Sequence, residues 1–587
     1  MKTLLKSHAK AQRRKDLSQS WLLEFFAPLR LCVSFFWVLL SYQPAAHAAA
    51  IRASHDPVKD ERPITEKERE HWAWKPLIDT SGRTLDSFFK PEPSASREAL
   101  IRRIYFDLTG LPPTPADLSD TSDLSVIVEK LLASPRYGEH WAQWWLDLAR
   151  YAETDGFEHD KDRAHAWKFR DWVINALNND LPLDEFVRVQ IAGDLLGVEM
   201  PTGFLFAGPD MPDINNQELR RHTVLNDITA TVGSVCLGLQ LGCAQCHDHP
   251  YDPLSQADFY RVRAFFDDTV LTQRDKQLGP FVRPFKEGVP ASVVFVRGDH
   301  TRPGPAITPG LPRILNGAAK DRVALAKALT SRDNVLFLRA MANRLWQQHF
   351  GTPLSANPAD LGHQGSAPEN PALLDWLAAE LPRQNFSLKK LHTLIILSKT
   401  YQSAARAPRR LTGEMLRDTL LSISGDLSPK NGGESVHLAL PAEISATLLK
   451  THQKKAADAT AQGCRSIYTF ARRNARHPIF DLFDRPDALA TCSRRNESTI
   501  APQALLLLNS ELSLQSAKKL AARLKADFGS EVPQIAREAI LRCFGREPQK
   551  ADLDAATAFF AKQPDFSLAL EDYCLALINA NEFVFVD

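Results

Sequence analysis

The sequence predicts a mainly α-helical, multi-helical protein of two domains, with minor β elements in the linker between them and in the C-terminal half. Apolar residues recur at three- and four-residue intervals through much of the 587 residues, which is the spacing of helices that bury one face. The 38 prolines outnumber the 27 glycines, so fixed turns rather than flexible glycine linkers separate the predicted helices. With 44% hydrophobic residues the chain can bury a large core.

The chain opens with the pattern of a secretory signal. A basic stretch precedes the apolar run from Leu31 to Leu40, and Ala46-His47-Ala48 offers small residues for cleavage. We therefore expect an exported protein of the periplasm or cell envelope. An uncleaved membrane anchor is the alternative, although the apolar run is short for a span. No later stretch approaches the roughly 18 apolar residues of a transmembrane helix, so the mature chain is expected to have none.

Breaks in the helical spacing divide the chain into five regions. These are a signal peptide (1–50), an extended lead-in (51–90), a helical domain (91–269), a linker with a small β element (270–313) and a mainly helical C-terminal domain (314–587). Trp72 and Trp74 are expected to dock the lead-in onto the body. In the linker, Ala291–Val296 is rich in β-branched residues and a cluster of glycines and prolines follows it.

The helical domain is predicted from stretches with apolar residues at helical spacing. In chain order they are Arg97–Leu108, Val126–Leu132, Arg136–Tyr151, Trp167–Leu177 and Leu183–Leu196. The prolines at 112 and 113 end the first of these helices. A long helix from Glu218 to Leu241 is expected to carry the segment Gly242–Pro253 at its C-terminal end. Ser255-Gln256-Ala257-Asp258 then resembles a capping box that opens a further helix.

The C-terminal domain shows the same spacing. Its predicted helices are 318–329, 335–349, 371–381, 388–398, 502–508, 512–524, 532–544 and 568–583. Between them, Cys464–Phe470 is predicted to be a strand.

Cys243-Ala244-Gln245-Cys246-His247 has the C-x-x-C-H pattern of covalent c-type haem attachment. Two cysteines about one helical turn apart can each add to one vinyl group of the same porphyrin. The residue after the second cysteine then lies beneath the iron, so His247 is predicted to be the proximal ligand of the haem iron. Cys243, Cys246 and His247 are therefore the predicted cofactor-binding residues, with haem c as the cofactor.

Two other chemistries fit the same thiols. A C-x-x-C pair can form a redox-active or structural disulfide in an exported protein. A zinc or iron site is the second alternative, because Cys236 lies about two turns upstream on the same predicted helix; its ligands would be Cys236, Cys243, Cys246 and His249 or His247.

The sequence leaves the sixth position of the iron open. Met211, His249 and His222 are its candidate ligands, and a filled position favours electron transfer whereas an open one favours small-molecule chemistry. The cysteines outside the motif form no regular disulfide framework, although one bridge such as Cys464–Cys492 would suit an oxidising compartment.

An aromatic stripe supports a different class of function. Trp141, Trp144 and Trp145 fall on one face of a predicted helix, which either faces the core or forms a wall against a planar cofactor or sugar ring. Four acidic residues lie near this stripe, and glycoside chemistry needs paired carboxylates; they are Glu139, Asp147, Glu153 and Asp155. A glycan-handling enzyme or binding module, with a polysaccharide as substrate, is therefore an alternative.

Several phrases together resemble the planctomycete cytochrome-like domain of unknown function. They are Ile104–Pro115, Arg136–Tyr151, Ala166–Asp171, Gly193-Asp194 and Gly242–Pro253. Later phrases resemble its usual partner, the planctomycete-specific C-terminal domain of unknown function; they include Asn343–Trp346, His349–Gly351 and Leu373–Leu377. The chain departs from many relatives in having one C-x-x-C-H, and it has Asp360-Leu361-Gly362-His363 where they usually have Asp-Phe-Gly.

The resemblance implies a cytochrome-like motif but supplies no reaction. The leading hypothesis is an exported haem protein that exchanges electrons with a partner protein or oxidises a substrate held by the second domain. A structural protein of the envelope, with the C-x-x-C as a disulfide or metal site, is the third class. The formal net charge of +1, without a basic stripe beyond the N-terminus, gives no reason to expect a nucleic-acid partner.

Overall fold

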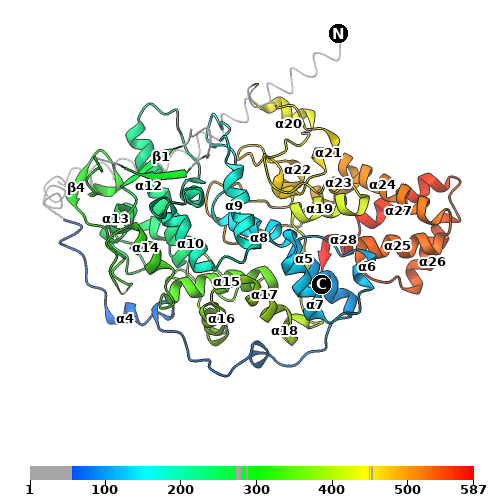
Figure 1. Cartoon of the computed structure of the whole chain (residues 1–587), viewed down its shortest axis with the longest axis horizontal. Helices are drawn as coiled ribbons and strands as arrows, with labels where there is room; N and C mark the ends of the chain where they lie inside the picture. The colour runs from blue at the N-terminus through cyan, green and yellow to red at the C-terminus, as the bar shows by residue number, and fades with distance from the viewer. Residues whose placement is uncertain are drawn as a thin grey trace, which may run out of the picture. The chain divides into compact units, whose positions relative to one another are not determined.

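The computed structural model describes residues 56–272, 279, 281–285, 288–315, 317–448, 450 and 454–587. The predicted signal peptide and its cleavage site lie outside these residues. Glu61–Asp587 form one compact unit. Helices dominate it, and the strands in the described part of the chain pair only in twos, so the mainly α prediction is confirmed (Figure 1).

Five helices form the centre of the first half, and their bounds agree with the helical spacing of the sequence. They are α5 (Arg97–Thr109), α7 (Leu124–Ala133), α8 (Pro135–Leu148), α9 (Trp167–Asn178) and α10 (Leu183–Ala192). Helix α8 packs against both α5 and α9. Local chemistry sets its start: Ser134 caps the helix through the backbone N–H of Arg136, and Pro135 occupies the first turn.

The helix predicted from Glu218 to Leu241 ends earlier than expected. Helix α12 (Gln217–Val232) passes into a π-helical turn, η5 (Gly233–Leu237), which stops at Gly238. Gly238 is left-handed, with φ of 61°, and a Cβ there would come within 2.9 Å of the Leu361 side chain. The C-x-x-C therefore does not continue the helix but lies on a separate 3-10 turn.

That turn is η6 (Leu241–Gln245), and it leads to α13 (Gln256–Ala264). The predicted capping box is confirmed, because the Ser255 hydroxyl accepts from the Asp258 N–H and the Asp258 carboxylate accepts from the Ser255 N–H.

Three short antiparallel pairs supply the β structure. Strand β1 (Thr269–Thr272) pairs with β2 (Phe281–Pro284), β3 (Val293–Phe295) with β4 (Pro303–Ala306), and β5 (Arg409–Arg410) with β6 (Phe585–Val586). The linker strand expected within Ala291–Val296 is thus confirmed as β3. The strand predicted at Cys464–Phe470 is wrong: the segment holds a 3-10 turn, η9 (Ser466–Tyr468), and makes only one bridge, between Val436 and Thr469.

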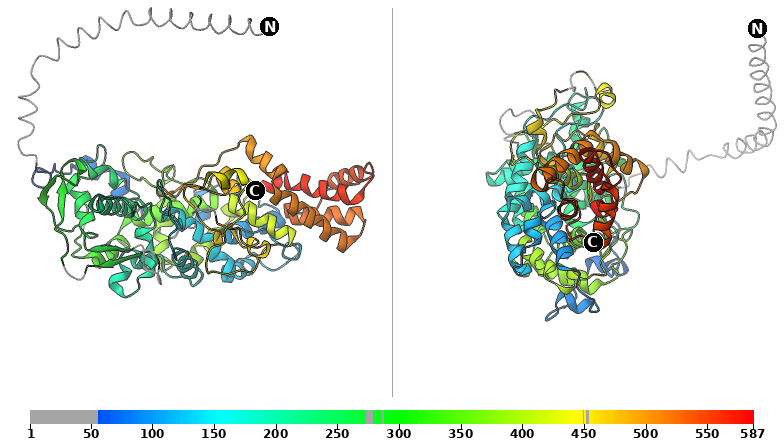
Figure 2. Two further views of the ribbon diagram at one scale, coloured as in Figure 1. Left: turned by 90° about the horizontal axis from the view of Figure 1, so that it is seen from above. Right: turned by 90° about the vertical axis from the view of Figure 1, so that its right-hand side faces the viewer.

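The second half contains most of the predicted helices, and among its main helices α19 and α26 are the two that the sequence did not predict. Its main helices are α14 (Arg322–Leu329), α15 (Val335–Phe350), α16 (Pro371–Arg383), α17 (Leu388–Ile396), α19 (Gly413–Ser424), α23 (Ala501–Asn509), α24 (Glu511–Phe528), α25 (Val532–Phe544), α26 (Lys550–Phe560) and α27 (Phe566–Ile578). Helices α24 to α27, orange to red in Figure 2, gather at one end. They share a buried apolar cluster with α19 and with Phe106 of α5.

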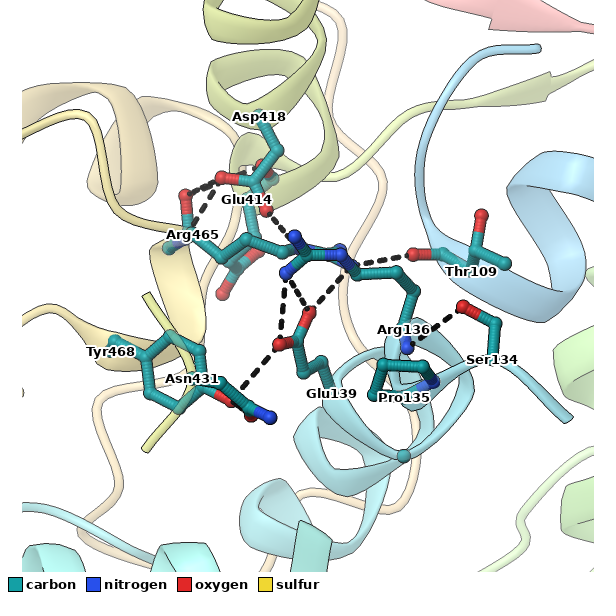
Figure 3. A network of polar contacts seen from close by, with 12 residues as sticks. Thr109, Ser134, Pro135, Arg136, Glu139, Glu414, Asp418, Asn431, Arg465 and Tyr468 are labelled. Carbon is teal, nitrogen blue, oxygen red and sulfur yellow. Dashed lines mark hydrogen bonds and ion pairs between the residues drawn. The ribbon is translucent and has the colours of Figure 1, made fainter. Parts of the chain in front are cut away.

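A buried polar network joins the two halves (Figure 3). The Arg465 guanidinium donates to the Thr109 carbonyl at 2.9 Å, to Glu139 of α8 at 3.2 Å and to Asp418 of α19 at 2.9 Å. The Tyr468 hydroxyl donates to the other oxygen of Glu139 at 3.0 Å. Removing one partner of a buried ion pair leaves an uncompensated charge in the interior, so these contacts link the two halves in one polar core.

The lead-in docks onto the body through its tryptophans, as predicted. Trp72 and Trp74 belong to a 3-10 turn, η1 (Trp72–Trp74), and the Arg339 guanidinium lies 5.7 Å from the Trp72 ring centre. Arg339 also donates to the Ala73 carbonyl at 3.1 Å and to both oxygens of Asp375.

Candidate functional site

The two thiols of the C-x-x-C are exposed at one turn of the surface. Cys243 lies within η6 and Cys246 is its C-cap, and both are free thiols. Residues three apart in a 3-10 helix eclipse one another, so the two side chains leave the turn on the same side. Leu241 at the start of the turn and Ala244 between the cysteines are fully buried and anchor the turn. The fold thus presents a dithiol at the surface without burying either sulfur.

His247 follows the second thiol, and its imidazole is exposed with a defined tautomer. Its Nδ1 lies 2.6 Å from the carbonyl oxygen of Asp248. Because a carbonyl can only accept, Nδ1 carries the proton in the neutral ring, and Nε2 keeps its lone pair. An imidazole whose other nitrogen donates to a backbone carbonyl is the usual state of a metal ligand.

Neither of the two other histidines considered as iron ligands has this arrangement. His249 is buried, and its Nδ1 accepts the N–H of Asp252 at 2.8 Å. The Nδ1 of His222 lies 2.6 Å from an Arg263 nitrogen, which can only donate. In the neutral form of both rings the proton is therefore on Nε2. That nitrogen then has no free lone pair with which to bind iron.

The third candidate for the sixth position, Met211, lies on the lining of a separate cavity. That cavity has a volume of about 230 Å³ and is lined only by residues 155–161 and 210–214. None of the motif residues contributes to it.

Cys236 differs from the two motif thiols in its surroundings. It is fully buried in η5, and burial raises the pKa of its thiol to about 12. Metals are bound by the thiolate, so this environment opposes ligation. The described residues contain no group of three or more His, Cys, Asp or Glu side chains placed to hold a metal ion. The alternative zinc or iron set remains a prediction.

The possible bridge between Cys464 and Cys492 is not formed. Both are free thiols, Cys464 buried and Cys492 partly exposed. Burial raises the pKa of both thiols, that of Cys492 to about 12.

Three residues outside the predicted ligand sets form a cluster near the motif, two of them, Asp252 and Asp360, within electrostatic reach of Cys243. Asp252 and Asp360 are both buried, and His363 donates to Asp252 through its backbone N–H at 2.7 Å and its Nδ1 at 3.1 Å. Partial burial and then the carboxylates of Asp360 and Asp252 raise the pKa of the Cys243 thiol. Catalytic dithiols have a lowered pKa, so these charges do not favour thiol–disulfide exchange.

The tryptophan stripe of α8 faces the core. Trp141, Trp144 and Trp145 are all buried, and the Trp145 indole donates to Gln190 at 2.7 Å. The core-facing interpretation is therefore confirmed, although Trp141 and Trp144 also line a cavity of about 150 Å³ with Glu139 and Asp147.

The acidic residues beside this stripe are all engaged with basic or hydroxyl groups. The contacts are Glu139 with Arg136 and Arg465, Asp147 with Arg495, Asp155 with Arg163, and Glu153 with Ser435. A glycosidase needs one carboxylic acid and one free carboxylate on either side of its substrate. The four side chains are placed as structural ion pairs and hydrogen bonds, so the geometry does not favour glycoside hydrolysis here.

Two family models match the chain, in the order that the sequence suggested. Residues 83–270 match the model described as "PSCyt2: Protein of unknown function (DUF1549)", and residues 321–560 match "PSD1: Protein of unknown function (DUF1553)". No match was found among curated proteins or among solved structures. The C-x-x-C-H lies in the first matched region, and His363 lies in the second.

Proposed function

Because the chain belongs to the proteins in which a PSCyt2 domain precedes a PSD1 domain, we propose that it is an exported redox protein carrying haem c. Cys243 and Cys246 would hold the haem through thioethers, and His247 would be its proximal ligand. The observation that supports this proposal is the pairing of two exposed, free thiols on one side of a turn with an imidazole whose Nε2 keeps its lone pair.

The residues at and around the C-x-x-C-H suit covalently bound haem in three respects. Leu241 and Ala244 fix the turn in the core, so neither thiol has to be exposed by unfolding before it can react. The Asp248 carbonyl holds the His247 ring in the tautomer that ligates. The raised pKa of Cys243 favours the protonated thiol over a thiolate that would undergo disulfide exchange. Bound haem would supply a one-electron iron couple at the protein surface.

Export is the second part of the proposal and rests on the N-terminal sequence. A basic stretch, an apolar run and a small-residue cleavage motif together are typical of a secretory signal. In the part of the chain that the structure describes, no helix has the length and apolarity needed to cross a bilayer. The electron-transfer partner or oxidised substrate would meet the exposed turn that carries the thiols.

The test is expression of the full chain into a periplasm that contains haem-maturation machinery. We expect a haem-peroxidase stain on a denaturing gel and an intact mass increased by one haem. The C243A and C246A variants should each lose the two-thioether product. C236A is the matched control, because this buried thiol is not part of the predicted attachment and its loss should leave haem in place.

A colourless band of unmodified mass, obtained while a control cytochrome matures in the same cells, would refute the proposal. Metal analysis of that sample would then separate the alternatives. Zinc or iron that is lost in C236A would support the four-ligand metal site, and a metal-free, oxidisable thiol pair would support the disulfide.

A further inference from the structure

His363 is held in the manner of a ligating imidazole although it lies far along the chain from the motif. The Asp252 carboxylate accepts from the backbone N–H of His363 at 2.7 Å and from its Nδ1 at 3.1 Å. A carboxylate can only accept, so in the neutral ring Nδ1 carries the proton and Nε2 keeps its lone pair. The side chain is 31% exposed, and no described residue makes a hydrogen bond to this Nε2.

Other segments fix the same ring from its faces. The His71 ring centre lies 4.3 Å from that of His363 with a tilt of 31°, and the Trp74 ring centre lies at 6.3 Å. His71 itself is not a competing ligand, because its Nδ1 accepts the Ala73 N–H. The lead-in, the segment after the C-x-x-C-H and the turn at His363 thus converge on one imidazole.

The turn before His363 is built around the same carboxylate. Asp252 is fully buried, and a Cβ on Gly362 would overlap its carboxyl group. The Gly362 N–H donates to Asp360 at 3.0 Å, which closes the turn. Only glycine lets the backbone lie this close to Asp252, so the contact that orients His363 depends on the backbone as well as on a side chain.

The imidazole lies in the same neighbourhood as the thiols. The Leu361 N–H donates to the Gly238 carbonyl at 2.7 Å, and the Gln240 amide, three residues before Cys243, donates to the Ala359 carbonyl at 3.1 Å. Asp252, which accepts from His363, also donates its N–H to Nδ1 of His249 at 2.8 Å, two residues after His247. Of the four histidines His222, His247, His249 and His363, His247 and His363 are the two whose Nδ1 faces an acceptor, and one lies in each of the two regions that the family models match.

We propose that His363 is the second axial ligand of the haem held by Cys243, Cys246 and His247, and that Asp252 is the residue that positions it. This inference rests on the proposed function. Carboxylate–imidazole pairs commonly orient ligating histidines and raise their basicity. A filled sixth position would make the protein an electron carrier rather than an enzyme that binds a small molecule at the iron.

The test compares haem-loaded H363A, D252N and H222A full-length proteins with the wild type. We expect haem stain and intact mass to be unchanged in all of them. The wild type should have the absorption spectrum of low-spin, six-coordinate haem and should bind carbon monoxide slowly when reduced. H363A should be high-spin and bind carbon monoxide at once, and added imidazole should restore the low-spin spectrum. H222A is the control, because the His222 Nδ1 faces Arg263 and the ring is not expected to ligate.

D252N separates positioning from ligation. It keeps the size of the side chain but weakens the acceptor, and loss of an orienting partner typically lowers metal affinity 10- to 100-fold. We therefore expect a mixture of spin states in D252N that excess imidazole converts to the low-spin form.

Each failure has a distinct signature. A haem-loaded H363A with the wild-type spectrum, or a wild type that binds carbon monoxide at once, would overturn the ligand assignment and leave the proposed function intact. A wild type without haem would overturn the proposed function and this ligand with it. Thermal unfolding of each variant shows that a spectral change does not come from a misfolded chain.

Discussion

Arg465 makes two of the buried ion pairs at the junction of the two halves, and its removal should lower the stability of the whole unit. In R465M, Glu139 and Asp418 lose a charged donor and the Thr109 carbonyl loses its partner. The side chains of Arg465, Glu139 and Asp418 are only 4%, 0% and 3% exposed, so both carboxylates would keep a charge that is shielded from bulk solvent.

The expected loss of unfolding free energy depends on the hydrogen bonds that each carboxylate keeps. Breaking one partner of a buried ion pair typically costs about 3 to 5 kcal/mol. Glu139 still accepts from Arg136 at 2.9 Å and from Tyr468 at 3.0 Å, and Asp418 still accepts from the Ser466 N–H at 2.8 Å. We therefore expect the lower end, about 3 kcal/mol.

The assay is urea denaturation followed by tryptophan fluorescence and by circular dichroism, with the midpoints compared. R494M is the matched control, because Arg494 is exposed and makes no ion pair among the described residues; its cost should stay within about 0.5 kcal/mol. Adding D418N to R465M should recover part of the loss, since it removes the stranded charge. An R465M midpoint equal to that of R494M would refute the argument that the network holds the halves together.

Three further predictions follow from other sites. Burial is the largest single influence on Glu414 and opposes its ionisation, but the charges of Arg495 and Arg485 with the hydrogen bonds to the carboxylate together lower its pKa to about 2 from an ordinary 4.5. This stabilisation is therefore present above about pH 4.5 and lost towards pH 2, and E414Q should flatten that acid limb of the stability curve. G238A should lower the thermal midpoint more than G82A, since both glycines have positive φ but only Gly238 has a side chain within 4 Å; equal shifts would contradict this. G362A should displace the buried carboxylate beside it and give haem-loaded protein the spectrum expected of H363A, with unchanged haem mass.

Helices could be predicted from the sequence where apolar residues repeat on one face and capping residues stand at the ends. Helix α8 begins at a serine followed by proline, and α13 begins with the capping box that the sequence indicated. The strand predicted at Cys464–Phe470 failed because its polar groups bond to helices instead of to a neighbouring strand. The Ser466 N–H, for example, donates to Asp418 of α19, and nothing local in the sequence records that partner.

The candidate site likewise has one part that the sequence predicts and one part that only the fold brings together. The C-x-x-C-H motif is local, so its three residues could be found from spacing alone. Asp252 and His363 are 111 residues apart, and they meet in the region where Gly238 packs against Leu361 of the later turn. A single sequence gives no reason to pair them. The phrase Asp360-Leu361-Gly362-His363, with glycine in a tight turn before histidine, is a local sign of the site.

What separates the histidines around the motif is the atom that faces Nδ1, and that atom is set by the fold. A carbonyl faces Nδ1 of His247 and a carboxylate faces that of His363, whereas N–H groups face those of His249 and His222. Acceptors leave Nε2 with a lone pair and donors place a proton there. The four imidazoles look equivalent in the sequence, but in the fold two keep a lone pair on Nε2 and two carry a proton there, and the two with a lone pair lie in different matched regions. If both bind one haem, the PSCyt2 and PSD1 domains would share a single redox centre, which gives a physical reason for the second domain to accompany the first.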